Sequence, residues 1–283
     1  MGLWDSVTGF FSDIGDFFSG KGFFELAGYL WNTLMESAGD VLLKDPSRGS
    51  YAGIWSDLGS IYTALNVIAT SLVVLFFLYG FLRDSVDIHS ELTLDRTIKM
   101  FIRLILTANA VSFAFSWMPD FFKWAKNITV VILGTKTFGF SFDGAEVYEQ
   151  IADADWGAMV AFLTSFLFFL FAAICGFIVI LTVLKRVINI YLIAPFCAIA
   201  LSTLAAGGQT SQVGYSYIRT FLGYVFSACL IAVVIVISGS FINTFAITSG
   251  NAIVKLVECC VKMGAIATAV KGADSVMQKA FNL

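Results

Sequence analysis

Long apolar runs dominate the pattern of residues along the chain. Four of them contain no charged residue, at 58–82, 156–184, 187–218 and 220–254. Each exceeds the roughly 20 residues that a helix needs to cross a hydrocarbon core about 30 Å thick. A weaker run also qualifies, because its Arg103 lies near one end, where the side chain can reach the membrane surface. The runs predict about five transmembrane helices, at 58–82, 97–117, 156–184, 187–206 and 217–243.

Apolar residues recur at helical spacing outside these runs as well. Residues 23–43 and 251–283 each predict an amphipathic helix, whereas 119–155, which begins with a proline, predicts a loop that carries a surface helix. The start of the chain predicts one more amphipathic helix, with an acidic polar face. Its apolar face consists of Leu3, Trp4, Val7, Phe10, Phe11, Ile14, Phe17 and Phe18. Lipid or a neighbouring subunit could cover this face, and its heptad spacing leads us to predict a neighbouring subunit.

These elements predict an all-α, polytopic membrane protein. Lys and Arg concentrate in the 83–103 segment, at Lys185 and Arg186, and in the C-terminal helix. By the positive-inside rule this side is cytoplasmic, so five spans place the N-terminus outside and the C-terminus inside. The predicted regions are an extracytoplasmic helical region 1–57, two spans in 58–118 with a cytoplasmic loop 83–99, an extracytoplasmic cap 119–155, three spans in 156–250 and a cytoplasmic helix 251–283.

Composition agrees with a membrane protein. Of 283 residues, 58% are hydrophobic and 13% charged. These charged residues are too few to cover the surface of a water-soluble protein of this length. The net charge of −3 argues against tight binding of nucleic acid. Five cysteines show neither a disulfide framework nor a metal-binding spacing, so we predict no metal and no cofactor.

Candidates for catalysis are scarce. His89 is the one histidine and lies between Ile88 and Ser90 in a charged cytoplasmic loop, where we expect a solvated side chain and no role in a nucleophile system or a metal site. No predicted span contains a carboxylate pair, so intramembrane acid–base chemistry has no candidates. We therefore predict that the protein is not an enzyme.

Other residues suggest structural roles within the spans. Pro195 predicts a kink or a gating hinge, together with Gly207 and Gly208 in the break that follows. Four cations at predicted span ends are expected to anchor the inner leaflet: Arg83, Arg103, Lys185 and Arg186. Four intramembrane asparagines are expected to bond between helices or to line a wet path: Asn66, Asn109, Asn189 and Asn243.

Several of these features occur together in one known family. They are the Lys185-Arg186 pair, the Ala194-Pro195-Phe196 stretch, the Gly/Gln/Ser break at 207–212 and the sequence YSYIRTFLGY that follows it. In this order they resemble the TrbL-like polytopic subunit of conjugative type IV secretion systems, in its short Gram-positive form. The resemblance covers residues from about 55 onward and lacks the long extracytoplasmic insertion of larger relatives. It implies a non-catalytic, homo-oligomeric channel or scaffold subunit, which works with cytoplasmic ATPases and transiently contacts translocating DNA and protein.

Two other classes share this composition. A small-solute transporter or ion channel usually shows ionisable midplane sites and paired repeats, and neither is visible in this sequence. A holin, toxin or immunity protein is compatible with the amphipathic start. Neighbouring genes for conjugative ATPases and a relaxase would favour secretion over both.

Overall fold

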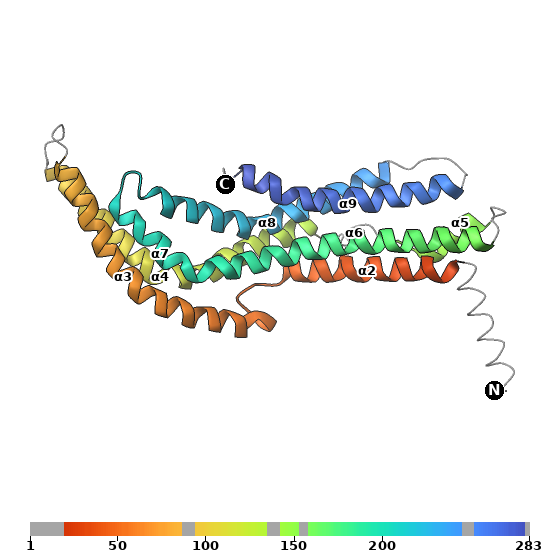
Figure 1. Ribbon diagram of the computed structural model, residues 1–283, viewed down its shortest axis with the longest axis horizontal. Helices are drawn as coiled ribbons and strands as arrows, with labels where there is room; N and C mark the ends of the chain where they lie inside the picture. Colours follow the sequence, from red (N-terminus) through yellow and green to blue (C-terminus); the bar gives the residue numbers. More distant parts are fainter. Residues whose placement is uncertain (1–19, 87–93, 135–141, 153–157, 245–251, 281–283) are drawn as a thin grey trace. The chain divides into compact units, whose positions relative to one another are not determined.

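The chain is an all-α, multi-pass membrane protein. The structure, a computed structural model, describes residues 20–86, 94–134, 142–152, 158–244 and 252–280, and every regular element in these ranges is a helix. The longer helices are α2 (Lys21–Leu43), α3 (Ala52–Val86), α4 (Leu94–Leu133), α6 (Ala158–Ile193), α8 (Gln212–Thr244) and α9 (Ala252–Ala280). The shorter ones are η1 (Gly49–Tyr51), α5 (Gly144–Ala152), η2 (Ala194–Phe196), α7 (Cys197–Ser202) and η3 (Thr203–Ala206). Figure 1 shows their order along the chain.

Within the described ranges, four helical stretches are long and apolar enough to cross a membrane. They are Gly49–Val86, Thr97–Leu133, Met159–Ala206 and Gln212–Ser238. The predicted helix at 23–43 is present as α2 and the one at 251–283 as α9. The predicted helix over residues 3–18 lies outside the described residues, as do His89 and its loop.

Two predicted boundaries are wrong. The turn expected at Lys185 and Arg186 does not exist, because α6 continues through both residues and the chain next reverses after Ala206. The two predicted spans on either side therefore form one helical stretch, and the described residues contain four candidate spans instead of about five. A basic pair commonly marks the end of a span, but one of these cations is buried by α8, as described below.

The second wrong boundary is Pro119, where we expected a loop. Helix α4 contains Pro119 and runs on to Leu133, so the predicted cap at 119–155 begins with almost four turns of helix. Proline removes one backbone donor from the helix. Met118, Phe122 and Ala125 are all buried just around it, and their packing holds the helix together across that defect.

The chain folds into two compact units whose segments alternate along the sequence. Among the described residues, the first unit contains α2 up to Leu42, residues 131–134, α5, α6 up to Leu184, the later part of α8 from Ile231, and α9 up to Ala273. The second contains residues 43–130, 185–230 and 274–280. Helices α6 and α8 thus contribute one part to each unit.

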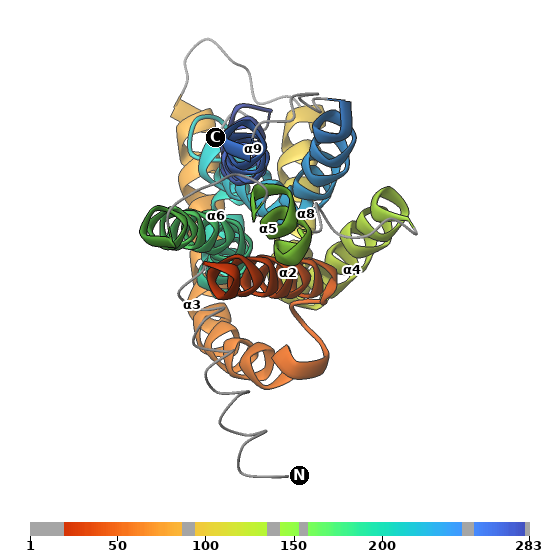
Figure 2. The same cartoon turned by 90° about the vertical axis from the view of Figure 1, so that its right-hand side faces the viewer.

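Aromatic rings form the core of the first unit. Phe23 of α2 packs against Phe162, Phe166 and Phe169 of α6, with ring centroids 5.4–6.0 Å apart. Farther along α2, a stripe of fully buried side chains faces the same way, as its amphipathic pattern predicted. Helix α2 therefore runs beside α6, as Figures 1 and 2 both show. Its apolar face meets protein in this unit.

The second unit packs α3 and α4 around the kinked stretch from Lys185 to Ala206 and the first part of α8. Helix α3 contacts η2, α7 and η3. Small buried residues, including Ala69, Ala194 and Ala198, allow this close packing. Tyr62 of α3 stacks on Phe115 of α4 at 4.9 Å and donates a hydrogen bond of 2.6 Å to a backbone carbonyl of α4.

Candidate functional site

The second unit contains a kink at Pro195, the position where the sequence predicts one. Proline has no backbone N–H, and the α-helix gives way to a 3-10 turn over Ala194–Phe196 before α7 begins. Pro195 is buried, so the kink lies inside the unit. The hydroxyl of Tyr217 on α8 donates a 3.0 Å hydrogen bond to the carbonyl of Ile193, the last residue before the turn. Tyr217 thus donates to a backbone oxygen that the irregular turn leaves available as a hydrogen-bond acceptor.

Gly207 and Gly208 form the reversal between η3 and α8. Their φ values of 65° and 57° lie in the left-handed region, which glycine adopts without a steric penalty. A Cβ atom at Gly207 would collide with the guanidinium of Arg103, and one at Gly208 with that of Arg83. The two glycines therefore allow both arginines to approach the turn closely.

Arg83 is held against this turn by two kinds of partner. Its Nη1 donates to the carbonyl oxygen of Gly207 at 3.4 Å, and its Nε and Nη2 donate to Asp84 at 3.2 and 3.0 Å. Gly80, one turn earlier on α3, lies directly on the backbone of Ala206, where a Cβ atom would not fit. The structure thus brings together four residues that the sequence singled out separately, namely Arg83, Arg103, Gly207 and Gly208.

Arg186 is buried and does not act as a membrane-surface anchor, which corrects the prediction for this residue. It is 4% exposed, and it donates from Nε to the carbonyl of Tyr224 at 3.0 Å and from Nη2 to that of Val225 at 3.2 Å. The guanidinium therefore joins α6 to α8 inside the second unit. Its neighbour Lys185 is exposed on another face of the helix.

The predicted polar path of asparagines is not assembled by the described residues. Asn109 is exposed and donates to Ile105 in its own helix at 2.8 Å. Asn66 is half-buried, and its Oδ1 has no hydrogen-bond partner among the described residues. Asn189 is half-buried on α6, and the side chain of Asn243 lies outside the described residues.

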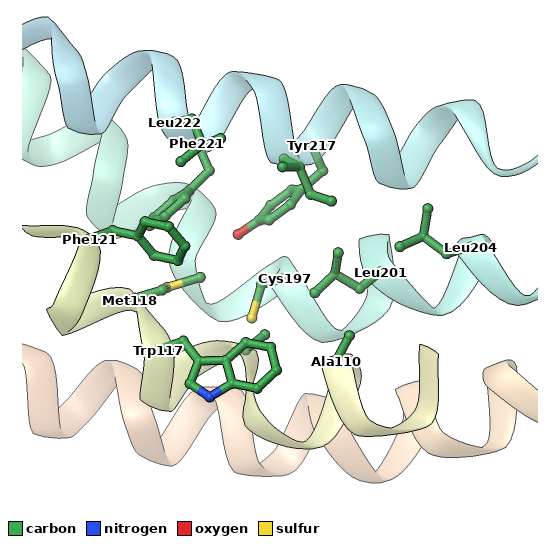
Figure 3. A pocket seen from close by; sticks show the side chains of 12 residues that line it. Ala110, Trp117, Met118, Phe121, Cys197, Leu201, Leu204, Tyr217, Phe221 and Leu222 are labelled. Atoms are coloured by element: carbon green, nitrogen blue, oxygen red, sulfur yellow. The ribbon is translucent and has the colours of Figure 1, made fainter. Parts of the chain in front are cut away.

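A cavity of about 210 Å³ lies next to the kink, between α4, the α7–η3 stretch and α8. Its lining is apolar and includes Ala114, Trp117, Leu204 and Phe221. Figure 3 shows Cys197 of α7 and Tyr217 of α8 among the side chains that line it. No feature of the sequence predicted this cavity, because its walls come from three separated segments whose residues look like ordinary apolar positions.

Metal-binding clusters are absent from the described part of the chain: no three His, Cys, Asp or Glu side chains lie close enough to hold a metal ion. All five cysteines are free thiols. The arrangement in the second unit is therefore one of helix-joining hydrogen bonds, a basic turn and an apolar cavity. Neither a comparison with protein-family models nor a search of curated proteins finds a match for this chain.

Proposed function

We propose that this protein is a non-catalytic membrane subunit of a conjugative type IV secretion apparatus, a channel or scaffold component that helps DNA and protein cross the cytoplasmic membrane of a bacterium. One observation carries the proposal: the segments that resemble the TrbL-like family pack together in the second unit. Arg186 binds the carbonyl of Tyr224, and Tyr217 binds that of Ile193. The break at 207–212 receives Arg83.

The use of polar groups in this unit supports a structural role. The hydroxyls of Tyr62, Tyr191 and Tyr217 each donate to a backbone carbonyl on another segment. Arg186 does the same with two of its nitrogens. Groups committed in this way fix helices relative to one another, and they favour a scaffold over a reactive centre.

The outer surfaces of the apolar helices support membrane contact and assembly. Large apolar side chains are exposed along α3, α4 and α6, among them Val67, Val131 and Met159. Lipid covers such a surface in a membrane protein, and neighbouring copies of the chain can cover part of it. We expect a homo-oligomer that contacts lipid and the cytoplasmic ATPases of the apparatus.

Deletion of the gene from its conjugative element tests the function. Transfer of the element to a recipient should fall by several orders of magnitude and return when the gene is supplied in trans. Complementation with Gly207→Ala should fail, whereas Gly272→Ala, at a site where a Cβ atom meets nothing, should restore transfer. Unchanged transfer after deletion, or lysis caused by expression of the gene alone, would refute the proposal.

The sidedness of the chain is open to a separate test. The orientation expected from the cations, with the N-terminus outside and the C-terminus inside, needs an odd number of crossings, whereas four candidate spans give an even number. Four crossings place Ser50 and Lys279 on one side of the membrane and Ser85 on the other. Single cysteines at these positions in a Cys-free chain should report this pattern with an impermeant thiol reagent. Labelling of Ser50→Cys and Lys279→Cys from opposite sides would instead show an odd number of membrane crossings.

A further inference from the structure

We propose that the second unit binds one membrane phospholipid, with an acyl chain in the cavity beside the Pro195 kink and the phosphate against Arg103 and Arg83. The site goes beyond the proposed function and does not depend on it. Three properties of the described residues support this site: the apolar lining of the cavity, its access from the outer surface of α4, and the position and charge of the two arginines.

The cavity suits a hydrocarbon ligand. Its volume of about 210 Å³ exceeds the roughly 150 Å³ of an engineered apolar cavity that stays dry and binds benzene. The one hydroxyl among its lining residues, that of Tyr217, already donates to Ile193. A water molecule would find few partners there, because it needs at least two polar groups. An acyl chain gains contact with the whole lining.

The cavity also reaches the surface that faces the membrane. Trp117 lines it and is 49% exposed, and it stacks on Phe113, which is exposed too. Along α4 the lining extends from Ala110 to Phe121, a length of about 16 Å at 1.5 Å per residue. A chain lying in the adjacent leaflet can therefore enter sideways between helices without crossing a polar layer.

The arginines lie at one end of this cavity. Arg103 precedes the first lining residue on α4, Ala110, by two helical turns, or about 10 Å, and lies on nearly the same face. On the other wall, Leu204 lines the cavity and Gly207, which meets Arg103, follows it after one turn. Both walls thus place the guanidinium groups beyond the same end of the apolar lining, as the phosphate of a phospholipid lies beyond its acyl chains.

Charge favours a phosphate-bearing lipid over an apolar protein segment. Asp84 neutralises Arg83, and Arg103 adds a positive charge that is exposed at the turn. Guanidinium groups bind phosphate oxygens with paired, charge-assisted hydrogen bonds. An apolar helix from another protein would fill the cavity without using these charges.

The test measures retained lipid by native mass spectrometry. Protein purified in mild detergent and exposed to phosphatidylglycerol should keep one phospholipid per chain after removal of loosely bound lipid. Ala114→Phe, which fills the cavity, and Arg103→Gln, which removes the charge, should each lower that occupancy about tenfold. Unfolding temperatures measured in the same detergent show whether each variant is folded.

Two matched variants serve as controls. Lys99→Gln removes an exposed cation one turn from Arg103 that pairs with Asp95 at 2.6 Å, and Ala108→Phe adds a ring on an exposed face of α4. Both should retain the lipid. Equal loss of lipid with Lys99→Gln and Arg103→Gln would show that general surface charge, and not a defined site, retains the lipid, and it would overturn the proposal. Loss with Ala114→Phe but not with Arg103→Gln would overturn it in favour of an apolar protein segment as the occupant.

Discussion

The two units of this protein solve the problem of helix packing with different chemistry. The first joins regular helices through rings, as where Phe23 meets three phenylalanines of α6. Its link from α2 to a non-helical segment is polar, since Asn32 exchanges two hydrogen bonds with the backbone of Phe142. The second unit contains two prolines within helical stretches and the reversal at Gly207, and it is joined by hydroxyl and guanidinium groups that donate to carbonyls.

This difference shows what irregular backbone requires inside an apolar protein. A regular helix satisfies its own peptide groups, so its neighbours need only match its shape. A kinked or looped segment leaves carbonyls available, and a buried donor from another helix can bind them. Tyr191 does so for Pro46, in the segment before η1, at 2.9 Å. The second unit therefore depends on individual polar side chains, whereas the first depends on apolar volume.

The largest effect is expected from Arg186→Glu. A carboxylate would face the carbonyl oxygens of Tyr224 and Val225 without a donor, and an uncompensated buried charge costs about 3–5 kcal/mol. Thermal unfolding in detergent should show a collapse of stability or no folded protein. Arg186→Met, which carries no charge, should be tolerated far better. Equal damage from Lys185→Glu, at the exposed neighbour, would show that net charge and not burial is responsible.

Gly207→Ala should have the next largest effect. Its φ of 65° strains an L-residue, and the added Cβ would displace Arg103, so we expect a loss of about 1–3 kcal/mol in the free energy of unfolding. Gly272→Ala in α9 has open space and a helical backbone, and it should raise stability by about 0.5–1 kcal/mol. Similar values for the two variants would mean that the turn adapts.

Tyr217→Phe should cost about 1 kcal/mol, the usual net value of one hydrogen bond. Tyr215→Phe, on the exposed face of the same helix, should change little. The cost of Tyr217→Phe should shrink in the Pro195→Ala background, where a regular helix can supply its own donor to Ile193. If Tyr217→Phe lowers the free energy of unfolding equally in the Pro195→Ala background, the hydrogen bond of Tyr217 does not depend on the kink. If Pro195→Ala also supports full transfer of substrate, the residue is not a gating hinge.

The last prediction concerns the reactivity of the Cys260 thiol in α9. It tests the packing of the first unit and involves no change in stability. Burial raises the pKa of the Cys260 thiol to about 11, with Cys259 and Cys175 adding to the effect. Because the thiolate is the reactive form, alkylation of the native protein should rise about tenfold per pH unit between pH 7 and 10. At pH 8 it should be on the order of a hundredfold slower than in denaturant, where the thiol recovers a pKa near 8.5.

Peptide mass spectrometry of the unaltered chain, with fragment ions that separate Cys260 from Cys259, gives both rates. A native rate that levels off near pH 8.5 would place this face of α9 in contact with solvent instead of protein.

Helix positions could be predicted from the sequence because apolar runs of sufficient length have few other uses. The break at Gly207 and Gly208 could be predicted equally well, because a pair of glycines is typical of a chain reversal. Two errors have a common cause. Lys185 and Arg186 suggest a span end, and Pro119 suggests a helix end, when only neighbours along the chain are considered. Carbonyls of α8 and a packed core around Phe122 reverse those local preferences.

The candidate site was predictable only in part. Arg83, Arg103 and both glycines were recognised one by one, but nothing in their spacing says that they meet. The sequence YSYIRTFLGY contains Tyr217 but predicts no role for it, although the hydroxyl of a buried tyrosine usually finds a hydrogen-bond partner. The cavity depends on the shapes left between α4 and α8, which residue types alone do not determine.

The alternation of segments along the chain has a consequence for biosynthesis. The first unit draws on α2, α6 and α9, so its core contacts join residues separated by well over a hundred positions. Its packing cannot be completed until α9 has left the ribosome, whereas the hairpin of α3 and α4 can pair much earlier. Contacts of such high sequence separation form slowly. During synthesis, the phenylalanine face of α2 must therefore wait without its full set of partners, a period in which membrane chaperones or the lipid surface itself would have to cover it.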